Sequence, residues 1–389
     1  MKKTRVFLTG ATGVMGTAGL KELIKFPENY DIKVLARDSR KNRKKLYPFQ
    51  KRGVKVIWGD LLDENSIKEG VEDSDIILHV GGMVSPIADL YPEKTLKVNV
   101  GSMQLIASIV KKYEEKNPQY PKKVVYIGSV AEYGSKNPPN HWGNSGNELK
   151  AARNDAYAES KILAEKELIK ANLKQWVSIR QTSILHSGLF KNASNPVVFH
   201  TPLQGVLEWI TTEDSGRLLE RICRPDVPVE FWCKAYNAGG GEEFRLVNIE
   251  FERKILKAIG CPPPEKIFEP NWFATDNFHG MWFEDSDKLD SILHYRLPDT
   301  FDKALERLKR SLPFYYQLAR IVPSFVIKTY MKRVAKHPDL GPLTWIKRND
   351  LDKIKNAWGS LENYNKIPDW KDFEEINLPK QKPVYLSEK

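Results

Sequence analysis

The sequence predicts an α/β protein built on a doubly wound parallel sheet, with a smaller C-terminal lobe and a helical tail. An apolar segment at residues 4–10 runs directly into a glycine-rich loop, in "FLTGATGVMG". Short apolar segments then alternate with segments of helical spacing up to about residue 185. Such alternation is typical of a parallel sheet that is covered by helices on both faces.

Five strands are expected in the first half of the chain, at residues 4–10, 31–37, 53–60, 74–82 and 122–129. The segments between them have helical spacing. In the first of these, Leu20, Leu23 and Ile24 fall on one helix face. The expected division is a Rossmann domain at 1–185 with a later strand around 229–241 returning to it, a substrate-binding lobe at 186–310, and a mostly helical C-terminal extension at 311–389.

The glycine loop predicts a dinucleotide site because it stands between a strand and a helix. Gly10 permits a tight turn, Gly13 lets a phosphate approach the backbone, and Gly16 lets the helix pack on the strand. The amides at the start of that helix would face the pyrophosphate.

The end of the second strand bears on the choice of cofactor. Arg37 ends the strand and Asp38 follows it. A guanidinium pairs well with a ribose 2′-phosphate, which favours NADP(H). A carboxylate accepts hydrogen bonds from an unmodified ribose, so Asp38 keeps NAD(H) open.

Tyr157 and Lys161 lie one helical turn apart in "YAESK", and Ser129 ends a predicted strand. A neighbouring ammonium is expected to lower the pKa of the tyrosine. The serine would then hold a substrate oxygen while the tyrosine exchanges its proton. A tyrosine and a lysine four residues apart are also common on solvated helix faces, so the pair gains its meaning from the serine and the glycine loop.

Taken together, these motifs resemble those of an extended short-chain dehydrogenase/reductase, the family grouped with NAD(P)-dependent epimerases and dehydratases. The matching segments are "TGATGVMG", "GDLLD", "HVGG", "KVNVGSMQLI", "VVYIGSVAEYG" and "YAESKILAE". They cover residues 1 to about 185 in the expected order, and "YNAGGGE" extends the match.

The resemblance implies a role for each matching position. The catalytic residues would be Ser129, Tyr157 and Lys161, with Asn99 in the framework of the active site. The implied cofactor-binding residues, with Arg37 added from the strand-end argument, are Gly10, Thr12, Gly13, Val14, Met15, Gly16, Arg37, Asp60, Leu61, Gly81, Gly82, Tyr157 and Lys161.

The chain departs from the family after its next strand. Relatives commonly have Arg-Pro where this chain has Arg180 and Gln181, and "LHSG" replaces a later element. This departure weakens an assignment to the nucleotide-sugar branches. His186 falls near the expected rim of the site, where a structural or solvent-facing role is favoured over a catalytic one.

The sequence of the second lobe does not identify the substrate. The aromatic segment at 268–283 is expected either to line an apolar pocket or to form the core of the lobe. Arg217, Arg245 and Arg296 are the candidates for binding a substrate diphosphate.

Composition narrows the class of partner. The formal net charge is +11, which favours an anionic partner. No nucleic-acid-binding motif appears, so nucleic acid is not expected. The three cysteines have no metal-ligand spacing and no metal is expected. No apolar run reaches the length of a bilayer span, so a cytoplasmic location is predicted.

The tail after residue 311 mixes aromatic, aliphatic and basic residues. Three roles stay open for it: peripheral contact with an anionic membrane, a contact with a second subunit in a homodimer, and a structural extension of the lobe.

Three functions are compatible with the sequence. The favoured one is an NADP-dependent carbonyl reductase or hydroxy dehydrogenase that interconverts a secondary alcohol and a ketone, on an apolar substrate, with Tyr157 as acid and base. The alternative is a nucleotide-sugar epimerase, dehydratase or reductase. A non-catalytic NADP-binding sensor is disfavoured, because such proteins tend to lack the tyrosine–lysine pair.

Overall fold

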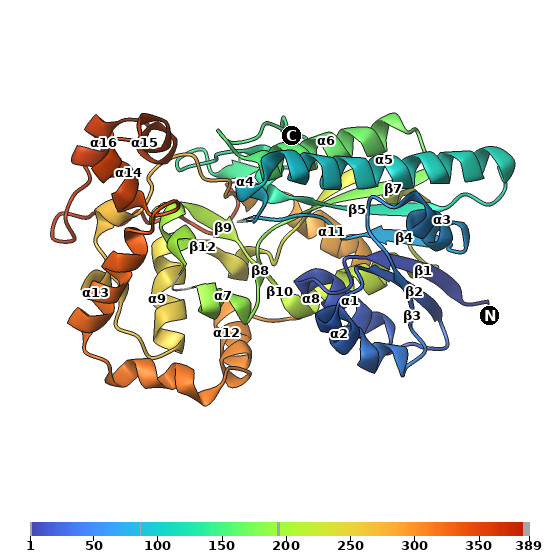
Figure 1. The fold of residues 1–389 in the computed structure, drawn as a ribbon, viewed down its shortest axis with the longest axis horizontal. Coiled ribbons are helices and arrows are strands. Elements are labelled where there is room, and N and C mark those ends of the chain that lie inside the picture. Colours follow the sequence, from blue (N-terminus) through green and yellow to red (C-terminus); the bar gives the residue numbers. More distant parts are fainter. Residues whose placement is uncertain (1, 86, 193–194, 384–389) are drawn as a thin grey trace.

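The computed structural model describes residues 2–85, 87–192 and 195–383, and Figure 1 shows its arrangement. Its centre is a seven-stranded sheet in the order β11-β7-β5-β4-β1-β2-β3, and every neighbouring pair is parallel. The doubly wound parallel sheet is therefore confirmed. The strands are β1 (Thr4–Thr9), β2 (Tyr30–Ala36), β3 (Lys55–Trp58), β4 (Ile76–His79), β5 (Lys123–Ser129), β7 (Gln175–Gln181) and β11 (Lys234–Ala238).

Helices cover both faces of the sheet because successive strand side chains point to opposite sides. In β1, Val6 and Leu8 pack in one buried cluster and Phe7 packs in another. The cluster of Val6 includes α1 (Val14–Leu23), α2 (Arg40–Gln50), α8 (Thr212–Ile222) and α11 (Ser286–Leu293). The cluster of Phe7 includes α3 (Glu64–Glu72), α5 (Pro92–Lys116) and α6 (Ala156–Lys170).

The sheet layer takes several elements from beyond residue 185. The strand β11 lies beside β7 in parallel register, with Tyr236 opposite Ile179. The helix α8 packs so closely on α1 that a Cβ at Gly216 would meet the backbone of Ala18 at 2.8 Å. The chain thus crosses between the sheet layer and the lobe more than once after residue 185.

The lobe is built from short paired strands and helices. The pairs are β8 (Ile184–Leu185) with β10 (Ile210–Thr211), β9 (Val206–Glu208) with β12 (Arg245–Val247), and β6 (Trp142–Gly143) with β13 (Trp282–Phe283). Its helices are α7 (Gly188–Asn192), α9 (Asn248–Ala258), α10 (Pro264–Ile267) and α12 (Phe301–Arg310), while α4 (Ile87–Leu90) belongs to the first half of the chain.

The aromatic segment at 268–283 forms the core of the lobe. Phe268, Trp272 and Phe273 are buried around Phe199, with ring centroids 5.1 to 5.9 Å from that ring. Edge-on aromatic packing of this kind stabilises a core beyond the area that it buries. Of the two interpretations of the segment, the core is the one that the structure supports.

The C-terminal extension packs against the lobe. After a 3₁₀ helix at Phe314–Ile321 it forms α13 (Ser324–Ala335), α14 (Pro342–Arg348), α15 (Leu351–Trp358) and α16 (Leu361–Asn365). The indole of Trp358 donates to the carbonyl of Phe273 at 2.8 Å, and that of Trp370 donates to Phe268 at 2.9 Å. Residues 384–389 of the expected extension lie outside the described residues.

None of the helices in the described ranges combines the length and the hydropathy that crossing a membrane requires.

Candidate active site

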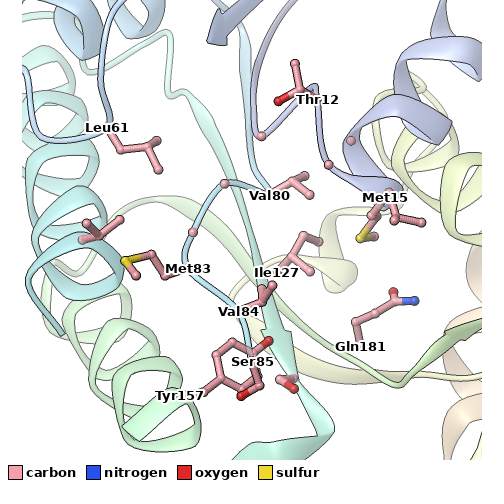
Figure 2. Close-up of a pocket in the computed structure, with 18 of the residues that line it drawn as sticks. Thr12, Met15, Leu61, Val80, Met83, Val84, Ser85, Ile127, Tyr157 and Gln181 are labelled. Atoms are coloured by element: carbon pink, nitrogen blue, oxygen red, sulfur yellow. The ribbon is translucent and has the colours of Figure 1, made fainter. Parts of the chain in front are cut away.

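A cavity of about 1290 Å³ opens at the carboxyl ends of the sheet strands. Figure 2 shows Thr12 of the glycine loop at one end and Tyr157 of α6 at the other, with Val80 and Ile127 between them. The carboxyl edge is where ligands bind in open parallel sheets. The glycine loop and the tyrosine–lysine pair therefore share one cavity.

The glycine loop brings the start of α1 to the cavity wall. Gly10 has φ +72°, and a Cβ there would meet the amide nitrogen of Gly81 at 2.7 Å. A Cβ at Gly16 would collide with the carbonyl of Gly10. Gly13 is the N-cap of α1, so the first amides of the helix face the space that a pyrophosphate requires.

Each other residue that was predicted for the pyrophosphate loop and the adenine also lines the cavity. These residues are Thr12, Val14, Met15, Asp60 and Leu61.

The adenosine end of the cavity is basic. Arg37, Lys41 and Lys45 line it together with Asp38. The carboxylate of Asp38 accepts two hydrogen bonds from Arg43, at 2.6 Å each, and this pairing lowers the pKa of Asp38. The carboxylate of Asp38 is thus engaged by a neighbouring guanidinium, whereas Arg37 forms no ion pair within the part of the chain that the structure describes.

Ser129, Tyr157 and Lys161 meet at the other end of the cavity. The side chain of Ser129 interacts with the hydroxyl of Tyr157, and the serine oxygen accepts from the amide of Ala131 at 3.2 Å. The ammonium of Lys161 donates to the carbonyl of Ile127 at 2.7 Å and lies 6.0 Å from the centroid of the Tyr157 ring. All three side chains line the cavity.

Burial dominates the electrostatics of this cluster. Burial raises the pKa of Tyr157 to about 12, and the interaction with Ser129, which lowers this pKa, offsets the effect of burial only in part. Burial also lowers the pKa of Lys161 to about 8, although the negative charge of Glu132 acts to raise it. The tyrosine pKa is thus raised, not lowered as expected, because loss of solvent is the largest cause and the ammonium of Lys161 is directed at the carbonyl of Ile127.

Glu132 holds the backbone of Ser129 in place. Its carboxylate accepts from the amide of Ser129 at 2.7 Å, completing a capping box, and it is fully buried. Arg180 lies 3.7 Å from this carboxylate and makes a two-bond pair with Glu165. Sequence reasoning missed Glu132, although the Ser-x-x-Glu spacing in "SVAE" is a signal for a capping box.

Asn99 has a positioning role in the structure. Its side-chain oxygen accepts from the amide of Met83 at 2.7 Å, and its nitrogen donates to Ser160 at 2.8 Å. A Cβ at Gly82 would meet that oxygen at 2.8 Å. Asn99 thus ties the cavity-lining loop at Gly81 and Gly82 to α6, while its own side chain is absent from the described cavity wall.

His279 is a cavity-lining residue that sequence reasoning missed. Its Nδ1 lies 2.6 Å from the carboxylate of Asp155, the N-cap of α6. Burial lowers the pKa of His279, but the hydrogen bond and charge of Asp155 outweigh it and leave the pKa above the ordinary value. Its place inside an aromatic segment offered no spacing that pairs it with Asp155. His186 also lines the cavity, where burial lowers its pKa.

Gln181 fits the nicotinamide end of a dinucleotide. Its side-chain nitrogen donates to Ser215 at 3.0 Å, while its side-chain oxygen is buried and accepts no hydrogen bond from any described residue. An orphaned buried acceptor that lines the cavity matches a ligand amide donor. Together with the basic adenosine end, this atom indicates that the cavity suits a nicotinamide dinucleotide.

The three arginines proposed for a substrate diphosphate are engaged elsewhere. Arg217 donates to the carbonyl of Tyr295 at 2.8 Å. Arg245 pairs with Glu208 at 3.0 Å inside the lobe, and Arg296 pairs with Asp287. None of them lines the described cavity.

Comparison with known proteins finds one family model that matches in the first half of the chain. Residues 6–184 match the model of the NAD dependent epimerase/dehydratase family. An uncharacterized membrane protein of Methanocaldococcus jannaschii is 25% identical over 295 residues, which cover 69% of this chain and 80% of that protein. Mouse 3 beta-hydroxysteroid dehydrogenase type 7 is 28% identical over 176 residues, which cover 43% of this chain and 45% of that enzyme.

The solved structures agree on the fold. A dTDP-glucose 4,6-dehydratase from Bacillus anthracis, solved in complex with NAD, superposes with a TM-score of 0.63 at 16% identity. The match covers 79% of this chain and 96% of the dehydratase. At this identity the likeness establishes the Rossmann-type architecture and does not carry a substrate.

Proposed function

Since residues 6–184 of this chain belong to the NAD dependent epimerase/dehydratase family, we propose that the protein is a nicotinamide-dependent enzyme that acts on a hydroxyl-bearing carbon. The observation that carries the proposal is that Ser129, Tyr157 and Lys161 line the same cavity as the glycine loop. A nicotinamide cofactor, when bound, takes or gives a hydride.

In the oxidative direction, Ser129 and Tyr157 would hold the substrate hydroxyl by hydrogen bonds. The phenolate oxygen of Tyr157 would accept the hydroxyl proton, and a bound nicotinamide would supply the acceptor for the hydride of the same carbon, so that a ketone is left. The reverse sequence reduces a ketone to an alcohol. Lys161 stabilises the phenolate that this exchange requires, once its charge is close to the phenol.

A nucleotide-sugar substrate is the first candidate. It is supported by the family description and by solved neighbours such as the dTDP-glucose 4,6-dehydratase. In this function the ketone formed at Tyr157 is an intermediate, and the enzyme is an epimerase or dehydratase that restores its cofactor in each turnover. Lys94 and Lys97 of α5, which line the cavity, are the available partners for substrate phosphates.

A secondary alcohol or ketone of an apolar compound is the second candidate. It is favoured by the engagement of Arg217, Arg245 and Arg296 outside the cavity. Apolar side chains also line the cavity, namely Met83, Val84, Ile184, Leu189 and Trp209. The similarity to the mouse hydroxysteroid dehydrogenase supports the same candidate.

We also propose NADP(H) as the preferred cofactor. The support is the cluster of Arg37, Lys41 and Lys45 at the adenosine end, where Asp38 is paired with Arg43. The NAD in the dehydratase structure supports NAD(H) as the alternative.

One assay separates the candidates. The purified protein is incubated with NAD or NADP and either UDP- and dTDP-sugars or a panel of secondary alcohols and ketones. An epimerase or dehydratase converts the sugar nucleotide without net change in reduced-nicotinamide absorbance, whereas a dehydrogenase changes that absorbance in proportion to product. Absence of turnover across both panels, with the cofactor bound, would favour the non-catalytic sensor.

A further inference from the structure

The segment from Arg307 to Pro338 carries charge of one sign. It contains eight lysines and arginines and no aspartate or glutamate. Three of the cations pair with carboxylates outside the segment, those of Asp299, Glu306 and Glu269. Among the described residues the other five have no carboxylate partner, and these are Arg310, Arg320, Lys332, Arg333 and Lys336.

The same segment exposes large apolar side chains. Phe314 is 82% exposed, Ile321 73% and Phe325 70%. The full set, which we call the tail patch, is Phe314, Tyr315, Leu318, Ile321, Val322, Phe325, Val326 and Tyr330. Exposed apolar side chains are ordinary when scattered singly, but a contiguous group marks an interaction surface.

The exposure follows the geometry of the two helices. In a 3₁₀ helix, side chains three residues apart eclipse one another, so Tyr315, Leu318 and Ile321 form one line. In α13, Met331 and Ala335 are buried against the lobe. Figure 1 shows the segment in orange along the lower edge of the lobe, from α12 to α13.

The inner side of the segment is anchored. The ring of Tyr316 packs edge-on against Phe190 of α7, at 6.4 Å between centroids. Ile327 and Val334 pack against the buried cluster that contains Met331. The segment therefore has a docked inner side and an exposed outer side that carries the tail patch and cations together.

We propose that the tail patch binds the surface of an anionic lipid bilayer, with its apolar side chains at the level of the acyl boundary and the cations at the headgroups. Amphipathic helices with aromatic side chains and a basic polar side lie in the plane of such an interface. Long basic side chains reach headgroups while their stems stay on apolar surface.

The cations around the tail patch favour a lipid bilayer over a second copy of the chain as its partner. A two-fold contact through the tail patch would set the same cations of both copies against each other. Like charges across an interface cost free energy, whereas an anionic bilayer attracts each of them. The surface is complementary to a bilayer and not to itself.

Co-sedimentation with vesicles tests this with the full-length protein. We expect binding to vesicles of phosphatidylcholine mixed with phosphatidylglycerol, weak binding to phosphatidylcholine alone, and a loss of binding as salt is raised. The variant Lys332→Gln with Arg333→Gln should weaken binding about 25-fold, since each cation contributes about fivefold. The triple variant Phe314→Ser, Ile321→Ser and Phe325→Ser should abolish sedimentation.

Matched controls lie on a distant helix and a distant loop. Lys112→Gln with Lys116→Gln removes two exposed cations of α5, and Tyr120→Ser removes a ring that is 74% exposed. Both should bind vesicles as the unaltered protein does. Equal binding by the tail-patch variants and the controls, or no binding to mixed vesicles, would overturn the proposal. A concentration-dependent dimer that the triple variant loses would also overturn it, by assigning the patch to a second copy.

Discussion

The cavity is lined by Arg37, Gln181 and Tyr157. A separate experiment tests the role of each of these side chains. Arg37 is at the adenosine end, Gln181 holds an unpaired acceptor among the described residues, and Tyr157 interacts with the side chain of Ser129. Arg37 and Tyr157 were predicted as site residues from the sequence, whereas Gln181 was noted there only as a departure from the family pattern. The raised pKa of Tyr157 was not predicted either, because burial is a property of the folded cavity.

Replacing Arg37 with alanine should change cofactor preference. A hydrogen bond to a charged group contributes about 1.5–3 kcal/mol, so the affinity for NADP should fall about 10- to 100-fold. The affinity for NAD should change little, because NAD lacks the 2′-phosphate. Titrations monitored by tryptophan fluorescence give both constants. Arg40→Ala, a cation outside the described cavity wall, is the control, and an equal loss for both cofactors would contradict the assignment.

Replacing Gln181 with leucine removes the buried acceptor while keeping a similar volume. We expect affinity for the dinucleotide to fall about 2- to 10-fold, the contribution of one neutral hydrogen bond. Ser215→Ala serves as control, since it removes only the bond that holds the side-chain nitrogen of Gln181. The affinities for the dinucleotide and for its adenosine half are measured in both proteins. If the leucine variant binds the dinucleotide as tightly as the unaltered protein does, Gln181 does not contact the nicotinamide.

The helix α6 is the element that assembles the chemistry. Its N-cap Asp155 accepts from the amide of Ala158 at 2.8 Å, its first turn carries Tyr157, and the next turn carries Lys161. Local patterns predicted the strands and helices of the first half because each βα unit carries its own apolar spacing. The contact of Asp155 with His279 joins residues 124 positions apart, and nothing local encodes it.

The pair of Asp155 and His279 predicts a pH dependence of stability. The pKa of His279 is raised in the folded state, so the pair stabilises fully below the unfolded value of about 6.5. That contribution is lost as pH rises through the folded pKa. The stability difference between the unaltered protein and His279→Gln should therefore shrink from about pH 6 upward. Urea unfolding at a series of pH values measures it, and a difference that grows with pH would contradict the pairing.

At the scale of the whole molecule, the extension and the lobe share one core. Trp358 is buried, contacts Trp345 and Tyr364, and donates to the carbonyl of Phe273. The sequence predicted helices here but could not place them, because their partners lie in a lobe that ends before residue 310. For the same reason, the sequence did not predict that α8 and α11 pack on the central sheet.

Trp358→Ala should lower the free energy of unfolding by about 3–5 kcal/mol, the usual cost of removing a buried aromatic side chain. Because the extension and lobe share their core, we expect a single urea transition that moves to lower denaturant. Leu351→Ala, at a position 64% exposed on the same helix, should shift it by less than about 0.5 kcal/mol. A separate early transition of the extension would contradict the shared core.

The measurement that tests the account most directly compares cofactor binding and turnover in Tyr157→Phe. The variant keeps the ring and loses the hydroxyl that faces the cavity beside Ser129. We predict unchanged affinity for the dinucleotide and a fall in turnover of about 10²- to 10⁴-fold, the contribution of a positioned acid–base group. Turnover equal to that of the unaltered protein, on the substrate that the panel identifies, would contradict the role of Tyr157.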